Sequence, residues 1–469
     1  MQIWLHWWSA VAPLRAACSR ERSFLWLAVA LAGFCTRGDL FGVSSTVRAL
    51  GLVARCYDRL LDFFHSPSVD VGRLARAWAR HALSLFPVYR CEGRPVLLGD
   101  GIKAPKSGRK MPAVKKLHQE SDGNTKPAYI MGHSIQVVSM LAGAGASFFA
   151  VPLCGRIHEG VKFTNRDKRT LPGKFFALLA SLDIGEPFTL VADAYYACGH
   201  MALGLLAGGC HLASRVRRNA VAYLPPPTGQ DGGKKRRGRP PVFGEKIRLW
   251  SLFDRADAGW QTAESPVYGE SGIEIRLLCR DLLWRPLRGL VRYVLVDHPT
   301  RGRLILVCTD TNMPPIRIIG LYGLRFKIEL SFKQALRVLG VYTYHFWMRR
   351  MEKLPRNSGT QHLHRASEEY RTAVRRKMDA YHRHIQIGLV VQGILQYLAT
   401  AHPRLVWASF GSWLRTIRPG VPPSEFVVAT ALAHSLPRFL ADTQNSSTFK
   451  KFLCENMDNG SYEGFRLTG

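Results

Sequence analysis

Three carboxylates in this chain occupy positions that suit divalent-metal chemistry. Asp100 closes the apolar run VLLGD, and Asp193 closes a second such run in TLVADAYY. Glu329 begins a helical pattern within YGLRFKIELSFK. A carboxylate at the end of a buried strand is costly to desolvate, so a cation or a proton usually lies beside it. Because the formal net charge of the chain is +31, the three residues indicate a metal site that faces a polyanion.

Asp100 and Asp193 each end a run of apolar, β-prone residues, which predicts a strand before each of them. If these strands are neighbours, both carboxylates emerge at one edge of the sheet. Two hard oxygen ligands close together suit Mg²⁺ or Mn²⁺. Two simpler interpretations remain open, because Asp100 could cap a turn and Asp193 could be the N-cap of a following helix.

The segment after Asp100, GIKAPKSGRKMPAVKKLHQESDG, is rich in lysine and arginine. Lys103 and Lys106 are its first two cations, and we expect both to contact a phosphate backbone beside the carboxylate. The alternative is that these lysines are solvated surface residues. The first interpretation is favoured because the basic segment directly follows a candidate metal ligand.

Glu329 belongs to a set of residues with helical spacing. Tyr322, Arg325, Glu329 and Phe332 are three, four and three positions apart, which predicts that they lie on neighbouring turns of one helix. Arg325 would then lie one turn before Glu329, where it could hold a phosphate. An ordinary surface ion pair between Arg325 and Glu329 explains the same spacing.

The composition indicates a folded protein with a nucleic-acid partner. The chain has 469 residues, of which 47% are hydrophobic and 10% aromatic, so it can bury more than one core. Lys and Arg number 65 against 34 Asp and Glu, and the excess is spread along the chain. This distribution favours a large phosphate-facing surface over a membrane surface.

The apolar stretch at residues 23–35, SFLWLAVALAGFC, is too short to cross a bilayer. A signal peptide would not normally start after twenty residues that contain Trp and Arg. We therefore predict a buried helix there and no membrane partner. The ten cysteines are scattered singly without a CxxC pair, which predicts reduced thiols and a cytoplasmic location.

The helices and strands that must position the carboxylates can be predicted from where the hydrophobic pattern changes along the chain. Together they predict an α/β protein. The pattern of residues 1–90 predicts helices with arginines on their polar faces, which either form a DNA-binding domain or are solvated surfaces. Residues 91–218 follow the order β-β-β-α-β-α-β, which predicts a mixed sheet with flanking helices and the first part of a catalytic core. Residues 219–310 contain a basic linker and a β-rich insertion. The core is completed by the Glu329 helix in 311–350, and 351–469 are helical with a loose tail of roughly 25 residues.

The linker PPPTGQDGGKKRRGRPP cannot pack a core. Its RGRP tetrapeptide at residues 237–240 resembles the core of a minor-groove AT-hook, and we expect Arg237 and Arg239 to contact DNA. Trp250 and Trp260 follow in the insertion, where they either fill the core or stack on a flipped base.

The motifs LLGDGI, VADAYY and YGLRFKIELSF together resemble those of bacterial insertion-sequence transposases of the DDE class with a Y-R-E-K signature, which are part of the retroviral-integrase and ribonuclease-H-like superfamily. The resemblance covers roughly residues 90–350 and implies a ribonuclease-H-like catalytic core interrupted by a β-rich insertion. It further implies that Asp100, Asp193 and Glu329 are the catalytic residues and hold two Mg²⁺ ions, with Mn²⁺ as a substitute. Tyr322 and Arg325 would hold phosphates near the cleaved end.

The chain departs from this family at one position. Where the signature Lys is expected, it has Ala335, Leu336 and Arg337. Lys333 or Arg337 could supply the charge, although Lys and Arg are not equivalent as phosphate ligands.

The resemblance also implies the substrates and the assembly. The substrates would be double-stranded DNA, namely the terminal inverted repeats of a transposon and a target. The enzyme would cut the transposon ends, transfer the 3′-OH, act as a homodimer and work at a bacterial nucleoid. Two alternatives remain: a non-catalytic DNA-binding protein derived from such an enzyme, and a ribonuclease-H-like nuclease that performs no strand transfer.

Overall fold

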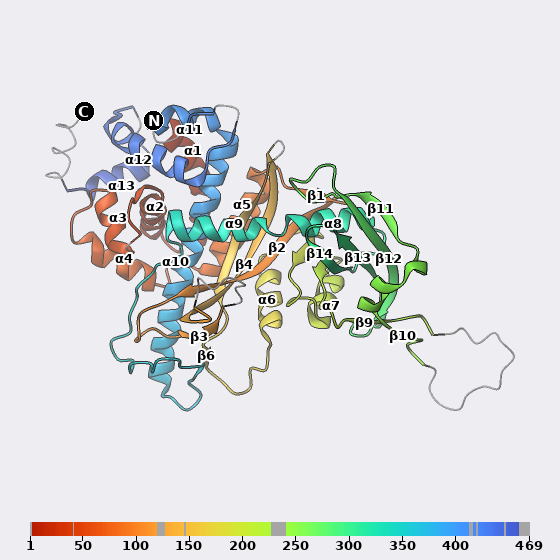
Figure 1. Ribbon diagram of the computed structural model, residues 1–469. Coiled ribbons are helices and arrows are strands. Elements are labelled where there is room, and N and C mark those ends of the chain that lie inside the picture. Colours follow the sequence, from red (N-terminus) through yellow and green to blue (C-terminus); the bar gives the residue numbers. More distant parts are fainter. Residues whose placement is uncertain are drawn as a thin grey trace.

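A mixed β-sheet extends across the molecule, with most of the N- and C-terminal helices gathered at one end of it and a β-rich region at the other (Figure 1). The computed structural model describes residues 2–40, 42–119, 127–144, 147–226, 241–411, 416–418, 421–444 and 447–458. Within these ranges the sheet has 13 strands.

Five strands form the centre of the sheet, in the order β5-β4-β2-β7-β8. They are β2 (Arg94–Pro105), β4 (Tyr129–Ala144), β5 (Ser147–Ile157), β7 (Thr189–Ala192) and β8 (His211–Arg215). The first three are antiparallel neighbours, whereas β7 runs parallel to β2, and β8 parallel to β7. With α6 (Leu171–Ala180) and α7 (Gly199–Ala207) between them in the chain, these strands confirm the predicted order and the α/β, ribonuclease-H-like class.

Helices cover both faces of this central sheet. On one face α6 comes so close to β2 that a Cβ atom added at Gly99 would lie 2.6 Å from the ring of Phe175. On the other face lies α10 (Glu368–Ala401), where a Cβ atom at Gly155 would lie 3.0 Å from Leu389. Asp100 is in register with Val137, and Val137 with Gly155, so Asp100 belongs to the face that α10 covers.

The insertion extends the central sheet. Its strands are β9 (Val221–Tyr223), β10 (Lys246–Arg248), β11 (Gln261–Glu264), β12 (Glu274–Trp284), β13 (Gly289–His298) and β14 (Gly302–Cys308). Strand β14 pairs antiparallel with β8, which joins the insertion to the core. The predicted β-rich pattern of the insertion is interrupted after β10, because Leu249–Asp254 forms a 3₁₀-helix (η2) that buries Leu249, Leu252 and Phe253.

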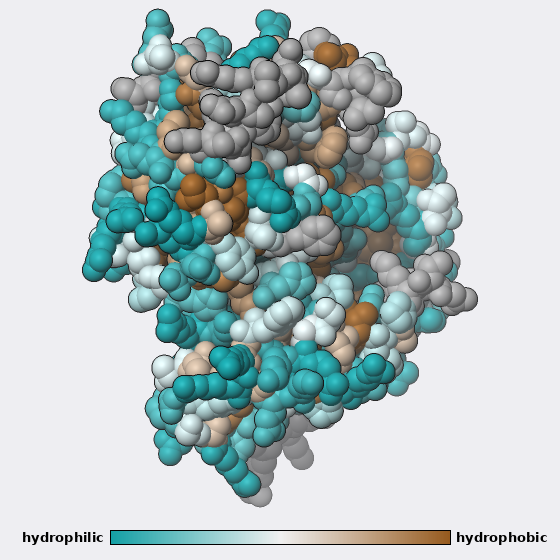
Figure 2. Space-filling model, turned by 90° about the vertical axis from the view of Figure 1, so that its left-hand side faces the viewer, coloured by the Kyte–Doolittle hydropathy of each residue, from teal (hydrophilic) through white to brown (hydrophobic). Residues whose placement is uncertain are grey.

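The N- and C-terminal helices pack on each other. They are α1 (Gln2–Val11), α2 (Glu21–Thr36), α3 (Val43–Ala49), α4 (Cys56–His65) and α5 (Val71–Leu85), with α10, α11 (Pro403–Phe410), α12 (Glu425–Ala441) and α13 (Thr448–Glu455). Trp4 Nε1 donates a hydrogen bond to the carbonyl of Leu432 at 3.2 Å, and Trp7 packs on Phe449 at 5.2 Å. The outer surface at this end is largely hydrophilic with scattered apolar patches (Figure 2), because the large apolar side chains lie inside.

Two predictions about these helices have different outcomes. Residues 24–35 of α2 are all buried, which confirms the buried helix expected there. The prediction of a loose tail is wrong for Thr448–Glu455, because this segment forms helix α13 and buries Phe449 and Leu453. None of the helices in the described ranges combines the length and the apolar character that a membrane crossing requires.

The segment around Glu329 is made of two helices instead of one. Helix α8 (Pro315–Leu324) ends before Arg325, and α9 (Lys327–Gln334) continues into a π-helix, Ala335–Leu339 (η4). Arg325 and Phe326 keep helical backbone angles between them. The helical pattern predicted beyond η4 is wrong as far as Ser367, because Gly340 ends the π-helix with a φ of +60°.

Short elements complete the fold. They are β1 (Arg90–Cys91), β3 (Lys115–His118), β6 (Val161–Lys162), β15 (Gln361–His362), η1 (Ala12–Ala17) and η3 (Ala256–Ala258). Strands β6 and β15 pair in parallel and hold the irregular segment after η4 against the core.

Candidate active site

Asp100 and Asp193 are brought together by the parallel pairing of β2 and β7. In this register Gly99 is opposite Ala192, so the two aspartates are the next residues on neighbouring strands. This confirms the expected juxtaposition. Asp193 does end its strand, but Asp100 does not, because β2 continues to Pro105 along its antiparallel partner β4. Asp100 therefore lies inside β2, at the point where the pairing of β2 with its parallel neighbour β7 ends.

Backbone amides orient both carboxylates. Asp100 Oδ1 accepts a hydrogen bond from the amide of Gly101 at 2.7 Å, and Asp193 Oδ1 accepts one from the amide of Tyr195 at 2.9 Å. The latter is an Asx-turn. The alternative of an N-cap is excluded for Asp193, because helix α7 begins after Cys198.

Arg325 links the first and the third carboxylate. Its Nη1 donates to Asp100 Oδ2 at 2.8 Å, and its Nη2 donates to Glu329 Oε1 at 2.6 Å. The side chains of Arg325 and Asp100 are only 18% and 17% exposed, whereas Glu329 is 54% exposed. The predicted ion pair along the helix is present, but the same guanidinium also ties the helix to β2. The pair is therefore part of a site and not an isolated surface contact.

The three carboxylates influence one another electrostatically. The pKa of Asp100 is raised to about 6, and burial is the largest cause. Arg325 and the Gly101 amide lower this pKa, whereas the charges of Asp193 and Glu329 raise it. A shift of this origin is typical of functional carboxylates in partly closed sites.

The donor set fits a divalent cation in its chemistry. Asp100 and Asp193 offer carboxylate oxygens from a rigid sheet, and a cation would offset the repulsion that raises the pKa of Asp100. Glu329 is engaged with Arg325 in this arrangement. Accordingly, in the part of the chain that the structure describes, no three His, Cys, Asp or Glu side chains converge closely enough to hold a metal ion.

Tyr322 lies beside this centre, as its spacing predicts. The centre of its ring is 5.8 Å from the guanidinium carbon of Arg325. Burial raises the pKa of its hydroxyl, and the charges of Arg325 and Arg215 lower it. The Tyr322, Arg325 and Glu329 side chains are therefore gathered at one edge of the sheet with Asp100.

The candidate phosphate contacts have different surroundings. Lys103 is exposed, and its ammonium donates to the carbonyl of His118 at 2.6 Å. Lys333 and Arg337 are exposed on α9 and η4. Arg237 and Arg239 lie outside the described residues.

The expectation for Lys106 is wrong, because its side chain is buried. Its ammonium donates to the carbonyl oxygens of Tyr342 and Tyr344 and lies 3.7 Å from the centre of the Tyr344 ring. Burial lowers the pKa of Lys106 to about 7. The residue ties strand β2 to the segment behind the Glu329 helix and has no access to a polyanion.

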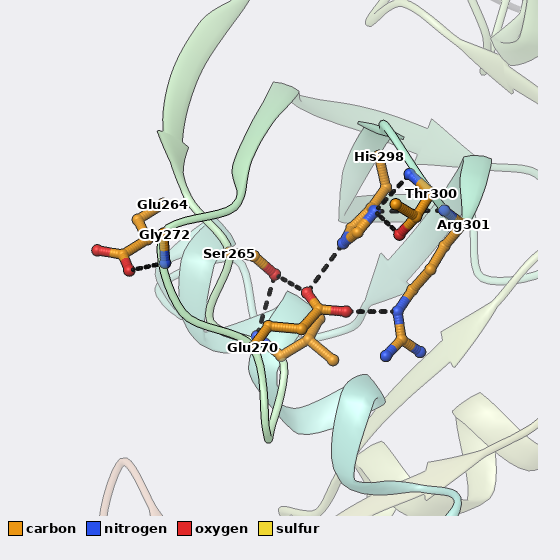
Figure 3. Close-up of polar contacts among 8 residues, drawn as sticks. Glu264, Ser265, Glu270, Gly272, His298, Thr300 and Arg301 are labelled. Atoms are coloured by element: carbon orange, nitrogen blue, oxygen red, sulfur yellow. Dashed lines mark hydrogen bonds and ion pairs between the residues drawn. The ribbon is translucent and has the colours of Figure 1, made fainter.

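The insertion supports the site through a loop that carries no recognisable motif. Glu270 accepts hydrogen bonds from Ser265 Oγ at 2.5 Å and from Arg301 Nε at 2.7 Å, and His298 Nε2 lies 2.9 Å from it (Figure 3). The loop held in this way places Tyr268 under the ammonium of Lys327, 3.8 Å from the ring centre.

Lys327 is buried and lies two residues before Glu329. The loop therefore packs on the junction of α8 and α9. No spacing in the sequence connects Glu270 to Glu329, so sequence reasoning missed this support.

The two tryptophans of the insertion are partly buried. Trp250 packs on Phe253 at 5.0 Å, and Trp260 packs on the same ring at 5.4 Å. Their role as core-forming residues is consistent with these contacts.

Comparison with known proteins gives one family. A family model described as DDE superfamily endonuclease matches residues 13–267. The match includes Asp100 and Asp193 and ends before Glu329. No significant match is found among curated protein sequences.

Proposed function

The chain belongs to the DDE superfamily of endonucleases, and on this premise we propose that it is a DDE transposase that cuts transposon DNA ends and transfers the 3′-OH into a target DNA. One observation carries the proposal. The parallel register of β2 and β7 makes Asp100 and Asp193 neighbours, and Arg325 links Glu329 to the same point. Three carboxylates on these elements are what metal-assisted phosphoryl transfer needs.

Asp100, Asp193 and Glu329 would hold Mg²⁺, or Mn²⁺, as a pair of ions. Such ions stabilise the attacking and leaving oxygens of a phosphate. The sheet fixes the first two carboxylates, while Glu329 is supplied by a separate helix. Arg325 has the forked N–H groups that match phosphate oxygens, and we expect it to contact the phosphate that is cut. Tyr322, whose ring lies beside Arg325, would hold the same phosphate.

Lys333 and Arg337 are the two candidates for the cation of the Y-R-E-K signature. Lys333 follows Glu329 by four residues, and Arg337 follows Lys333 by four more. A π-turn contains one residue more than an α-turn, so the π-helix at Ala335–Leu339 moves the position two turns after Glu329 toward Arg337. We assign the signature role to Arg337, with Lys333 as an additional phosphate contact.

The remaining DNA contacts belong to the same proposal. Lys103 would contact DNA from the opposite face of β2, three residues after Asp100, and the linker residues Arg237 and Arg239 would contact the DNA as well. Residues 1–90 would bind the transposon ends, and two copies of the chain would bring two ends together at the nucleoid.

The test is metal-dependent cutting of DNA that flanks the gene. With Mg²⁺ the wild-type chain should nick the terminal repeats and join them to a second DNA. Asp100→Asn, Asp193→Asn and Glu329→Gln should each reduce nicking by at least about 1,000-fold, because each removes a ligand charge. Glu455→Gln, which changes an exposed carboxylate at the end of α13, is the matched control and should retain activity.

The alternatives give different results in the same assay. Salt-sensitive DNA binding without any cutting would favour the DNA-binding protein. Cutting without joining would favour the nuclease. Full activity of any one of the three carboxylate variants would exclude the assigned triad.

A further inference from the structure

A basic groove lies between the end of the core sheet and the start of the insertion. It has a volume of about 850 Å³. Its walls carry four cationic side chains and one tryptophan, namely Arg217, Arg218, Lys246, Arg248 and Trp250.

Backbone hydrogen bonds hold the two walls of the groove in place. Strands β9 and β10 pair antiparallel, so that Arg248 is opposite Val221. The amide of Leu249 donates to the carbonyl of Ala220 at 3.2 Å, which closes the base of the groove. In the segment that connects β8 to β9, the amide of Ala220 donates to the carbonyl of Arg217 at 2.9 Å. The cations are therefore presented by a structured surface.

The charge of the groove is strongly positive. Its one lining carboxylate, Asp254, lies 3.1 Å from Arg303 Nη1, outside the groove, and is thereby partly neutralised. The guanidinium of Arg218 is stacked on Trp250 at 4.5 Å from the ring centre, which fixes its position. Arg217, Lys246 and Arg248 are exposed. No ion pair joins these three to a carboxylate of the described residues.

The groove begins next to the candidate active site. Strand β8 runs parallel to β7, with Ser214 opposite Ala192, so the chain leaves β8 at the edge where Asp193 lies. Arg217 follows three residues later. Burial raises the pKa of the Tyr195 hydroxyl, and the charge of Arg217 is among those that lower it.

We propose that this groove binds the phosphodiester backbone of DNA where it leaves the candidate active site toward the insertion. The path of the DNA from the active site into the groove rests on the proposed function. The binding of DNA in the groove does not depend on it. Four cations spread along two walls match a chain of phosphates better than a single anion. The exposed positions of three of them allow the backbone to lie along the rim.

The test is the salt dependence of DNA binding by the full-length chain, measured by fluorescence anisotropy in EDTA. The variant combines Arg217→Gln, Lys246→Gln and Arg248→Gln, and leaves Arg218 because it stacks on Trp250. Each lost phosphate contact should reduce the slope of log Kd against log salt by roughly 0.9 for duplex DNA and 0.7 for a single strand. The triple variant should therefore lose roughly 2 to 3 units of slope.

The matched control removes two exposed cations at the opposite end of the molecule, Arg438→Gln on α12 and Lys451→Gln on α13. Its slope should change less than that of the groove variant. An unchanged slope in the triple variant, or an equal loss in the control, overturns the proposal. Separate duplex and single-stranded oligonucleotides of one sequence show which form of the backbone the groove holds, because only the bound form loses slope.

Two further measurements keep the result interpretable. If the triple variant does not fold, Lys246→Gln alone, at an exposed strand position, should still lose roughly one unit of slope, and no loss counts against the groove. Metal-dependent nicking is measured in parallel. If the groove variant loses slope but the wild-type chain never nicks DNA, DNA binding by the groove is supported and the transposase proposal is contradicted. If the wild-type chain nicks normally but the groove variant keeps its slope, the transposase proposal is supported and the groove proposal is contradicted.

Discussion

Arg325 determines how the carboxylates of the site are arranged. It contacts both the strand carrying Asp100 and the helix carrying Glu329, through separate nitrogens of one guanidinium. A lysine at this position could donate to either carboxylate, but its single ammonium cannot reproduce the fork. The same fork matches two oxygens of a phosphate, so the proposed contact with DNA would use the same nitrogens as the structural contacts.

Arg325→Lys should therefore reduce the single-turnover nicking rate by about 100-fold, the cost of losing one oriented donor at a developing charge. The matched control is Arg317→Lys, an exposed arginine on the preceding helix α8, which should change the rate by less than about twofold. Nicking of a labelled duplex measures both variants. A rate for Arg325→Lys within twofold of the wild type would show that the fork is not used.

The elements of the site were partly predictable from local pattern. Apolar runs located β2 and β7, and helical spacing grouped Tyr322, Arg325 and Glu329, because strands and helices have short periods. The end of β2 was not predictable, since it depends on its partner β4. Nor was the burial of Lys106, which binds a carbonyl 236 residues further along the chain.

The loop of the insertion around Glu270 is the element that supports the junction of α8 and α9. Burial by itself raises the pKa of Glu270, but hydrogen bonds from Ser265, His298 and Arg301 hold it at about 2. A pKa below that of the unfolded chain means that the ionised form stabilises the fold. This contribution is complete above about pH 4.3 and is lost as the pH falls toward 2.

Glu270→Gln should reduce the free energy of unfolding by about 2 kcal/mol at pH 7, because it weakens several buried hydrogen bonds to a charge. The difference from the wild type should shrink as the pH falls from about 4 toward 2. Urea denaturation at several pH values measures it. Glu264→Gln is the control, because this exposed neighbour accepts a hydrogen bond from the Gly272 amide at 2.8 Å (Figure 3). An equal effect of both variants would contradict the supporting role of Glu270.

At the scale of the whole molecule, the N-terminal helices are joined to the central sheet. Trp78 of α5 is fully buried, and its Nε1 donates to the carbonyl of Pro152 in β5 at 2.8 Å. A Cβ atom added at Gly393 of α10 would lie 2.2 Å from the Trp78 ring. The guanidinium of Arg37, at the end of α2, binds the carbonyls of Leu339 and Gly340 behind the Glu329 helix. The helical pattern of residues 1–90 was visible in the sequence, but these long-range contacts were not.

If these contacts hold the two regions together, Trp78→Ala should cost about 3 to 5 kcal/mol of unfolding free energy, since a large buried side chain leaves a cavity. The loss should weaken the sheet as well as the helices, so one cooperative transition should move to lower denaturant by both tryptophan fluorescence and far-ultraviolet circular dichroism. Trp347→Ala, at a tryptophan that is 63% exposed, should change stability by less than about 0.5 kcal/mol. Two separate transitions, with the sheet unaffected by Trp78→Ala, would instead show that the N-terminal helices fold as an independent unit.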